Sequence, residues 1–139
     1  VAGGTGRPEG LNKGYYVRPT VFADVNNQMR IAREEIFGPV LSIIPFDTEE
    51  EAIEIANDTP YGLSANLWTR DLCRALEYVD QIEAGFVQVN QCAAPRSNVS
   101  YGGLKMSGLG KEYALDSMLN HFCSSKTVLI NAGTPAGGV

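Results

Sequence analysis

Two adjacent carboxylates and an aromatic ring stand where the backbone is predicted to change from helix to strand. The segment, which contains a Gly-Pro break, reads Arg33-Glu34-Glu35-Ile36-Phe37-Gly38-Pro39-Val40. Residues that bind ligands are often placed on such connections, which makes Glu35 and Phe37 candidates for function. The same pattern also fits two solvated carboxylates beside a core phenylalanine, because most carboxylates are exposed. Local pattern alone leaves both interpretations open.

Three cysteines and one histidine are the other side chains that could act in catalysis or bind a metal. They are Cys73, Cys92, Cys123 and His121. Their spacing contains no C-x-x-C pair, so it favours neither a disulfide framework nor a zinc site, and we expect no metal. Inert thiols are the simpler interpretation of the cysteines, and a satisfied or surface side chain that of His121. Reduced thiols fit a cytoplasmic location.

The glycine-rich segments do not match the known phosphate-binding loops. Gly110-Lys111 is followed by Glu112 and lacks the earlier glycine of a Walker A loop, and Gly108-Leu109-Gly110 has Tyr113 where a dinucleotide fingerprint needs a third glycine. Tight backbone turns are the expected use of these glycines.

Composition indicates one ordinary domain and excludes several partners. The chain has 139 residues, of which 44% are apolar, enough for a single core. Eleven basic and sixteen acidic residues give a net charge of −5, and no run of Lys or Arg offers a surface for nucleic acid or an anionic membrane. No apolar run approaches the roughly 18 residues of a membrane span. Because the chain opens on Val1 and shows no signal peptide, we expect the true N-terminus, with any targeting signal, to lie upstream.

Strands and helices alternate in the central part of the sequence. Residues 40–46 form a nearly continuous apolar run, which predicts a strand buried on both faces. Thr48 and Glu51 have capping-box spacing and begin a helix. A strand over 63–68 is followed by a helix that Thr69 is expected to cap and Gly85 to end, and then by a strand over 86–90. This order is typical of parallel βαβ units, so the predicted fold class is α/β.

The flanking segments are predicted from weaker signals. Residues 15–22 surround Arg18-Pro19 and are expected to be extended or edge structure, because proline cannot donate to a ladder. Residues 90–111 form a long irregular loop, of a length that is usually functional. A helix from Glu112 is expected to bury one apolar stripe, and residues 126–131 to form a strand. In open parallel sheets, ligands bind beyond the carboxyl ends of the strands.

Five blocks of the sequence, in this order and spacing, resemble the C-terminal part of the catalytic domain of NAD(P)-dependent aldehyde dehydrogenases. The resemblance covers about residues 10–131. The blocks are Glu34-Glu35-Ile36-Phe37-Gly38-Pro39-Val40, Asn57-Asp58-Thr59-Pro60-Tyr61-Gly62-Leu63, Ala84-Gly85 leading to Val89-Asn90, Tyr101-Gly102-Gly103-Leu104-Lys105-Met106-Ser107-Gly108-Leu109-Gly110-Lys111-Glu112, and Lys126-Thr127-Val128.

The resemblance implies roles for individual residues. Glu35 would accept hydrogen bonds from the hydroxyls of the nicotinamide ribose, and Phe37 would pack near the nicotinamide ring of NAD or NADP. The candidates for the wall of the substrate tunnel are Cys92, Pro95 and Tyr101. Residues 1–124 would belong to the catalytic domain and 125–139 to an oligomerisation strand and tail, in which residues 126–131 pair with another subunit of a homo-oligomer.

The resemblance also implies the reaction of the parent enzyme. Such an enzyme oxidises an aldehyde to a carboxylic acid through a cysteine thiohemiacetal and hydride transfer to the nicotinamide. Its cysteine nucleophile, in a Gly-Gln-x-Cys setting, its glutamate base and its oxyanion-binding asparagine all precede the Glu-Glu-Ile-Phe-Gly-Pro block. None is present here, so we expect a C-terminal fragment that contains no catalytic residue and is inactive alone. A non-catalytic scaffold or oligomerisation module of the same fold and a CoA-acylating relative stay open as alternatives.

Three positions depart from the pattern of the family and leave the aldehyde open. Ser100 replaces a common proline, Tyr101 a usual phenylalanine, and Gln88 a position often held by tryptophan. Arg96 near the tunnel would suit an anionic aldehyde, although an exposed arginine is the simpler interpretation. The choice between NAD and NADP depends mainly on residues outside this sequence.

Overall fold

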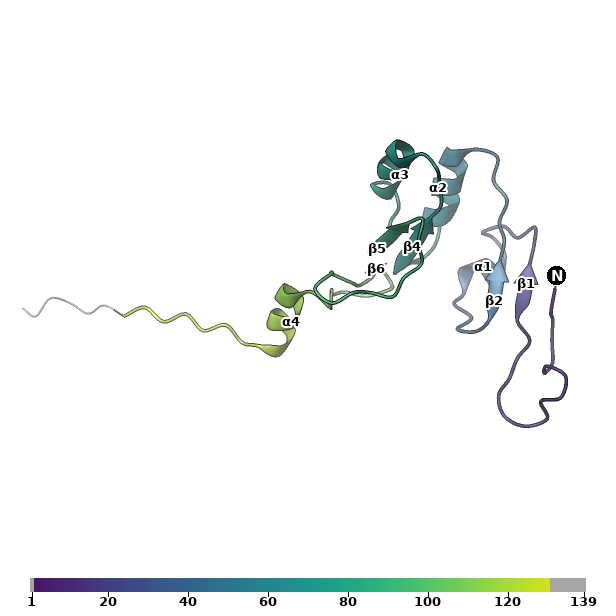
Figure 1. The fold of residues 1–139 in the computed structure, drawn as a ribbon, viewed down its shortest axis with the longest axis horizontal. Coiled ribbons are helices and arrows are strands. Elements are labelled where there is room, and N and C mark those ends of the chain that lie inside the picture. The colour runs from purple at the N-terminus through teal and green to yellow at the C-terminus, as the bar shows by residue number, and fades with distance from the viewer. Residues whose placement is uncertain (1, 131–139) are drawn as a thin grey trace, which may run out of the picture.

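The computed structural model describes residues 2–130, which form an elongated molecule (Figure 1). The first structural unit, at one end of the molecule, is a parallel strand–helix–strand. It consists of β1 (Thr20–Phe22), α1 (Arg30–Arg33) and β2 (Val40–Ser42), and Thr20 pairs with Val40 in the register of the strands. The expected extended structure around residue 20 is confirmed. The predicted strand over 40–46 ends early and is not buried, since Leu41 is 57% exposed.

A second parallel unit forms the centre of the molecule. It comprises α2 (Glu49–Asn57), β4 (Ser64–Leu67), α3 (Leu72–Val79) and β5 (Phe86–Val89), with β4 and β5 paired in parallel. The predicted α/β class with βαβ connections is therefore confirmed.

The two helix starts show which capping predictions hold. The Thr48 hydroxyl accepts the Glu51 N–H at 3.1 Å, and the Glu51 carboxylate accepts the Asp47 N–H at 2.7 Å, which confirms the cap of α2. The predicted cap of α3 is wrong. The Asp71 carboxylate, rather than Thr69, accepts the Arg74 N–H, because a carboxylate in the cap position is the better acceptor for the helix N-terminus.

The end of α3 also differs from the prediction. The helix ends at Val79, well before Gly85. Gly85 instead begins the approach to β5, where its N–H donates to the Gly62 carbonyl at 3.0 Å. Its glycine identity is therefore explained by close backbone packing rather than by a helix cap.

A small antiparallel pair joins the segment predicted to be irregular, residues 90–111, to the residues before the predicted strand over 63–68. β3 (Tyr61–Gly62) pairs with β6 (Leu104–Lys105), and Tyr101 forms an isolated bridge with Glu112. Within residues 2–130 the strands form three separate two-stranded sheets, two of them parallel as the βαβ prediction requires and this one antiparallel. Strand pairing over such sequence separations is decided by tertiary contacts that local pattern does not contain.

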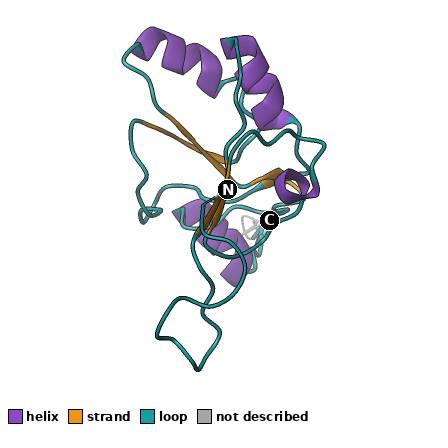
Figure 2. Cartoon of the chain, turned by 90° about the vertical axis from the view of Figure 1, so that its right-hand side faces the viewer, coloured by secondary structure: helices purple, strands orange, loops and turns teal. Residues whose placement is uncertain are grey.

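Helices α2 and α3 lie side by side over the central sheet (Figures 1 and 2). Arg74 of α3 forms an ion pair of 2.6 Å with Glu49 of α2, and the Tyr78 hydroxyl donates to the same carboxylate. This hydrogen bond, together with desolvation and the negative charge of Glu49, raises the pKa of Tyr78. Polar contacts therefore join the two helices, and apolar packing between them contributes little.

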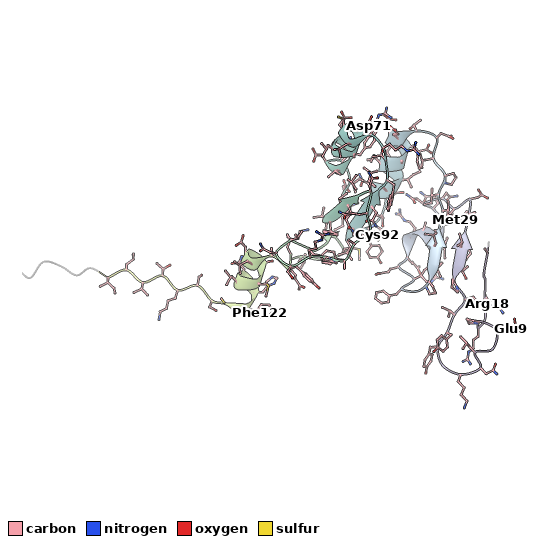
Figure 3. The ribbon with its side chains drawn as sticks, in the orientation of Figure 1. Glu9, Arg18, Met29, Asp71, Cys92 and Phe122 are labelled. Carbon is pink, nitrogen blue, oxygen red and sulfur yellow. The ribbon has the colours of Figure 1, made fainter. Side chains whose placement is uncertain are left out.

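The C-terminal part of the described chain differs from two predictions. α4 (Leu115–Phe122) is present, but none of its residues is buried, and the side chain of Phe122 stands at the exposed end of the helix (Figure 3). Residues 124–130 contain no strand, and Asn131 lies outside the described residues. An extended segment needs a paired neighbour to become a strand, and no described segment of this chain provides one.

The core is small. Among the described residues only Val25, at 4% exposed, and Ala75, at 0%, are buried apolar residues. The helix and strand faces that were predicted to be covered are consequently open to solvent.

Candidate functional site

Glu35 lies in a hollow that three distant segments enclose. The hollow has a volume of about 460 Å³ and is lined by Ala32, Glu34, Glu35, Tyr61, Leu63, Met106 and Ser107. These residues come from the end of α1, from the start of the β3–β4 segment and from the turn after β6. A volume of this size lies in the range of small-molecule sites.

The two neighbouring carboxylates have different surroundings. Glu34 forms an ion pair of 2.8 Å with Arg30 one helical turn earlier, and this hydrogen bond lowers the pKa of the Glu34 carboxyl. Glu35 makes no hydrogen bond or ion pair with other residues in the described part of the chain. Of the two carboxylates, that of Glu35 therefore has all of its acceptor capacity left for a ligand.

A second ion pair fixes α1 against the rest of the hollow. The Arg33 guanidinium lies 2.9 Å from the Asp58 carboxylate and also donates to the Asp58 carbonyl at 2.8 Å. The hydrogen bond from Arg33 lowers the pKa of Asp58. Asp58 follows α2 directly and precedes Tyr61, so this contact sets the distance between Glu35 and the opposite wall.

The opposite wall is held by backbone contacts between β3 and the turn after β6. The Met106 N–H donates to the Pro60 carbonyl at 2.9 Å, and the Ser107 hydroxyl accepts the Gly62 N–H at 3.0 Å. A side chain at Gly62 would place its Cβ 2.5 Å from the Glu83 carbonyl oxygen, so only glycine permits this approach.

Lys105 ties this wall to α2 and to the segment before β5. Its ammonium group donates to the carbonyls of Asn57 at 2.6 Å and Thr59 at 3.2 Å. It also forms an ion pair of 2.6 Å with Glu83. With its side chain only 25% exposed, Lys105 anchors the turn that brings Met106 and Ser107 to the hollow.

Phe37 is close to Glu35 in the chain but points into neighbouring hollows. It has a φ of +53°, a left-handed conformation that bulky residues rarely adopt, and is 91% exposed. It lines a hollow of about 380 Å³ that shares Ala32 and Glu34 with the Glu35 hollow, and a larger one between β1 and residues 4–18. The structure thus places the two predicted cofactor residues in adjoining hollows rather than in one.

The predicted tunnel residues do not meet in one cavity. Cys92 is exposed on the loop after β5 (Figure 3), and Pro95 is half-buried on the same loop. Tyr101 packs edge-on against Phe86, with ring centroids 5.2 Å apart. A hollow of about 220 Å³ beside β5 is lined by none of the three but by their neighbours Phe86, Val87, Gln88, Gln91, Ala93, Ala94, Arg96 and Val99.

Side-chain amides fix the start of this loop. Asn90 has a φ of +54°, and its side chain exchanges two hydrogen bonds, of 2.8 and 2.9 Å, with the backbone of Thr69. Gln88 is 7% exposed and bonds to both Asn66 and the backbone of Ala93. The amides of Asn90 and Gln88 therefore fix the position at which the loop leaves the sheet.

The sequence did not predict a role for Tyr61, Met106 or Lys105, although all belong to the blocks of the resemblance, and Ser107 was expected only to shape the return of the loop. The signal that could have found them is the repeated Gly and Pro around Tyr61 and Lys105, which marks segments that pack closely by backbone. Tyr61, Met106 and Ser107 line the same hollow as Glu35 only because the fold brings distant segments together.

The arrangement can bind a neutral hydroxyl-bearing ligand better than it can perform covalent chemistry. A partner-free carboxylate accepts hydrogen bonds from hydroxyls, and the lining also offers apolar surface from Ala32, Leu63 and Met106. Within residues 2–130 no group of three His, Cys, Asp or Glu side chains is placed to hold a metal ion. The same residues contain no helix long and apolar enough to cross a membrane.

Comparison with known proteins identifies the family. The model of the aldehyde dehydrogenase family matches residues 1–128. A betaine aldehyde dehydrogenase of Rhizobium etli is 48% identical over 134 residues, which are 96% of this chain and 27% of that protein. A putative aldehyde dehydrogenase of Staphylococcus aureus is 47% identical over 126 residues, with 91% and 26% covered.

Solved structures agree with this assignment. The Mycobacterium tuberculosis aldehyde dehydrogenase complexed with NAD+ superposes with a TM-score of 0.83 at 48% identity, over 94% of this chain and 27% of that one. The NAD+ complex of the Bacillus cereus aldehyde dehydrogenase also gives 0.83, at 40% identity, over 91% and 25%. The chain thus spans about a quarter of the length of its relatives. With a family match over nearly all of its residues and the fold of these structures, the chain belongs to the aldehyde dehydrogenase family.

Proposed function

We propose that this chain forms one wall of the cofactor site and part of the aldehyde passage of an NAD(P)-dependent aldehyde dehydrogenase, which oxidises an aldehyde to a carboxylic acid. The observation that carries the proposal is the partner-free carboxylate of Glu35, in a hollow of about 460 Å³ beside a neighbour that Arg30 already neutralises. The relatives solved with NAD+ support a nicotinamide dinucleotide as the cofactor.

The residues of the hollow fit the ribose of such a cofactor. A free carboxylate accepts hydrogen bonds from two vicinal hydroxyls, and each bond to a charged acceptor contributes roughly 1.5–3 kcal/mol. Glu35 would hold these hydroxyls, while Met106 and Leu63 would exclude water from the apolar side. Phe37, in the adjoining hollow, would pack near the nicotinamide ring and limit its rotation.

These residues would position the nicotinamide of the cofactor. When bound, the nicotinamide supplies the hydride acceptor of the oxidation, and the residues of this chain fix its orientation relative to the aldehyde. The left-handed backbone of Phe37 supports such a role, because strained conformations of bulky residues persist mainly where function requires them. Cys92, Pro95 and Tyr101 would line the aldehyde passage.

The proposal also covers the domain bounds, the pairing with another subunit, the location and the activity of residues 1–139 alone. Residues 1–124 would belong to the catalytic domain, and residues 126–131 would become a strand by pairing with another copy of the chain. Cys73, Cys92 and Cys123 are free thiols, which supports a cytoplasmic location. None has a general base beside it, so residues 1–139 alone would not oxidise aldehydes.

The test is aldehyde-dependent reduction of NAD+ and NADP+ by the natural polypeptide that contains residues 1–139. A panel of cationic, aliphatic and aromatic aldehydes covers the open choice of substrate, and the absorbance of the reduced nicotinamide is the readout. We expect turnover with at least one aldehyde and a carboxylic acid as the product. Reduction that requires coenzyme A and yields a thioester would instead support the CoA-acylating alternative, and no reduction with any aldehyde would contradict the proposal.

A further inference from the structure

Gln88 is one of two buried polar residues among those described, and it does not line the Glu35 hollow. It lies on β5 with 7% of its surface exposed, directly opposite Asn66 of β4 in the parallel register. A buried amide is costly unless its donors and acceptors are satisfied, so the partners of Gln88 show what the residue holds in place.

Both ends of the Gln88 amide are occupied. Its Nε2 donates to the Asn66 Oδ1 at 3.2 Å, and its Oε1 accepts the backbone N–H of Ala93 at 2.9 Å. The Asn66 Nδ2 in turn lies 3.8 Å from the Cys92 sulfur, a weak contact. The paired amides of Gln88 and Asn66 thereby connect the sheet to Ala93 and Cys92, two consecutive residues of the loop.

The contact to Ala93 is decisive because that segment has few other attachments. Among the described residues, the backbone N–H of Asn90 is bonded to the Leu67 carbonyl, and the next bonded N–H in the loop is that of Ala93. The Asn90 side chain fixes where the loop begins, and Gln88 fixes its direction three residues later. Without the Gln88 acceptor, the exposed Ala93 N–H would turn to water and release the loop.

We propose that Gln88 is a positioning residue that sets the conformation of the loop carrying Cys92 and Pro95, and through it the shape of the aldehyde passage. The second half of this statement rests on the proposed function, because that function assigns the loop to the passage. An apolar residue at position 88 could fill the same space but could not accept the Ala93 N–H.

The experiment measures the loop through the thiol of Cys92 in the natural polypeptide. Iodoacetamide labels the protein in its native state, and peptide mass spectrometry gives the alkylation rate of each cysteine. We expect Gln88→Leu to raise the Cys92 rate by roughly threefold or more, because the loop loses its Ala93 bond and the Asn66 amide beside the Cys92 sulfur loses its Gln88 partner. The rates of Cys73 in α3 and Cys123 at the end of α4, which are exposed and lie outside the loop, serve as internal controls and should not change.

Two further variants separate the hydrogen bond from the change in volume. Gln88→Glu keeps an acceptor for the Ala93 N–H but loses the donor to the Asn66 Oδ1, so its Cys92 rate should rise less than that of Gln88→Leu. Gln91→Leu makes the same substitution at an exposed position of the same loop and should change nothing. An unchanged Cys92 rate in Gln88→Leu, or an equal rise at all three cysteines, would overturn the positioning role.

Hydrogen exchange in the unaltered protein decides the question even if Gln88→Leu fails to fold. The Ala93 amide should exchange at least about threefold more slowly than the Ala94 amide, since only the former has an acceptor in the described structure. Equal exchange at both amides would overturn the proposal.

Kinetics then test the link to the aldehyde. In Gln88→Leu the KM for the aldehyde should rise several-fold while the KM for NAD+ stays constant, a division that general loosening would not produce. Unchanged aldehyde kinetics together with a raised Cys92 rate would remove the loop from the passage and refute that half of the proposal. If the unaltered protein oxidises no aldehyde, the proposed function fails. The alkylation and exchange results still test whether Gln88 sets the conformation of the loop.

Discussion

Glu34 and Glu35 are neighbours in the sequence, yet only one of them has a partner. Arg30 lies one helical turn before Glu34 and lowers the pKa of that carboxyl, so Glu34 stays ionised and its charge is satisfied. Glu35 faces the hollow without a described partner. A carboxylate without a protein partner beside a paired one fits the proposal that the first binds a ligand while the second supports the helix end.

Replacement of each glutamate by glutamine distinguishes these two roles. Glu35→Gln should weaken NAD+ binding by about 5- to 10-fold, because the amide retains hydrogen bonds but loses their charge-assisted part. Glu34→Gln, the matched control, should change binding by less than about twofold. Isothermal titration of the natural polypeptide with NAD+ measures both, and thermal unfolding should show intact folding. Equal effects of the two variants would contradict the assignment of Glu35.

Lys105 makes the most extensive contact between elements described above. Its one ammonium group joins α2, the β3–β6 pair and the segment before β5. Asn57, whose carbonyl accepts from Lys105, also uses its side chain to accept the Glu83 N–H at 2.9 Å and to donate to the Gln81 carbonyl at 2.8 Å. The antiparallel pair has only two residues in each strand, so these polar contacts replace the strand length that would otherwise hold it.

Loss of the Lys105 ammonium should therefore loosen the wall that carries Met106 and Ser107. Lys105→Met keeps the aliphatic part and should lower the free energy of unfolding by about 1–2 kcal/mol, since it leaves two backbone carbonyls without their charged donor. Urea unfolding of the natural polypeptide measures this change. Lys13→Met, at an exposed loop position, is the control and should be neutral. Identical stabilities for the two variants would show that the Lys105 contacts contribute nothing.

The contact between α1 and the end of α2 is the element-scale feature that depends on pH. The hydrogen bond from Arg33 lowers the pKa of Asp58 in the folded state, so this carboxylate stabilises the fold above its unfolded pKa. The contribution is lost as the pH falls through the lowered folded pKa. In Asp58→Asn this acid-dependent part should be absent, so the denaturant midpoint should fall less steeply than in the original protein between about pH 6 and pH 3. Parallel midpoint curves would contradict this role.

The elements that sequence predicts well are those that local chemistry decides. The Thr48 and Glu51 cap fixes the start of α2, and apolar periodicity locates α3, although its cap at Asp71 competes with Thr69 for the same role. Strand pairing was not predictable in the same way, because β3 finds its partner β6 through Lys105 and Gly62 rather than through pattern. In the site, Glu35 was predicted by a motif, whereas Tyr61 and Ser107 become its neighbours only through these long-range contacts.

At the scale of the whole molecule, the amount of exposed surface is unusually large. A folded monomer of 139 residues exposes roughly 7,000 Å², whereas this chain exposes 11,343 Å². Exposed large apolar side chains occur on the strands, on α3, on α4 and along residues 128–130. Apolar surface on this scale is the usual mark of an interaction surface or of a tendency to associate.

The exposed faces predict how residues 1–139 behave when produced alone. The open strand edges and the uncovered helix stripes should cause association, which light scattering at increasing protein concentration would detect as a rising mean mass. Leu129→Glu with Ile130→Glu places two charges in the exposed C-terminal segment and should reduce this association. Leu109→Glu, at an isolated exposed position in a turn, is the control that tests whether added charge alone suffices. A concentration-independent monomer mass for the unaltered chain would contradict the expectation, because it would mean that these apolar faces do not drive association under the conditions of the measurement.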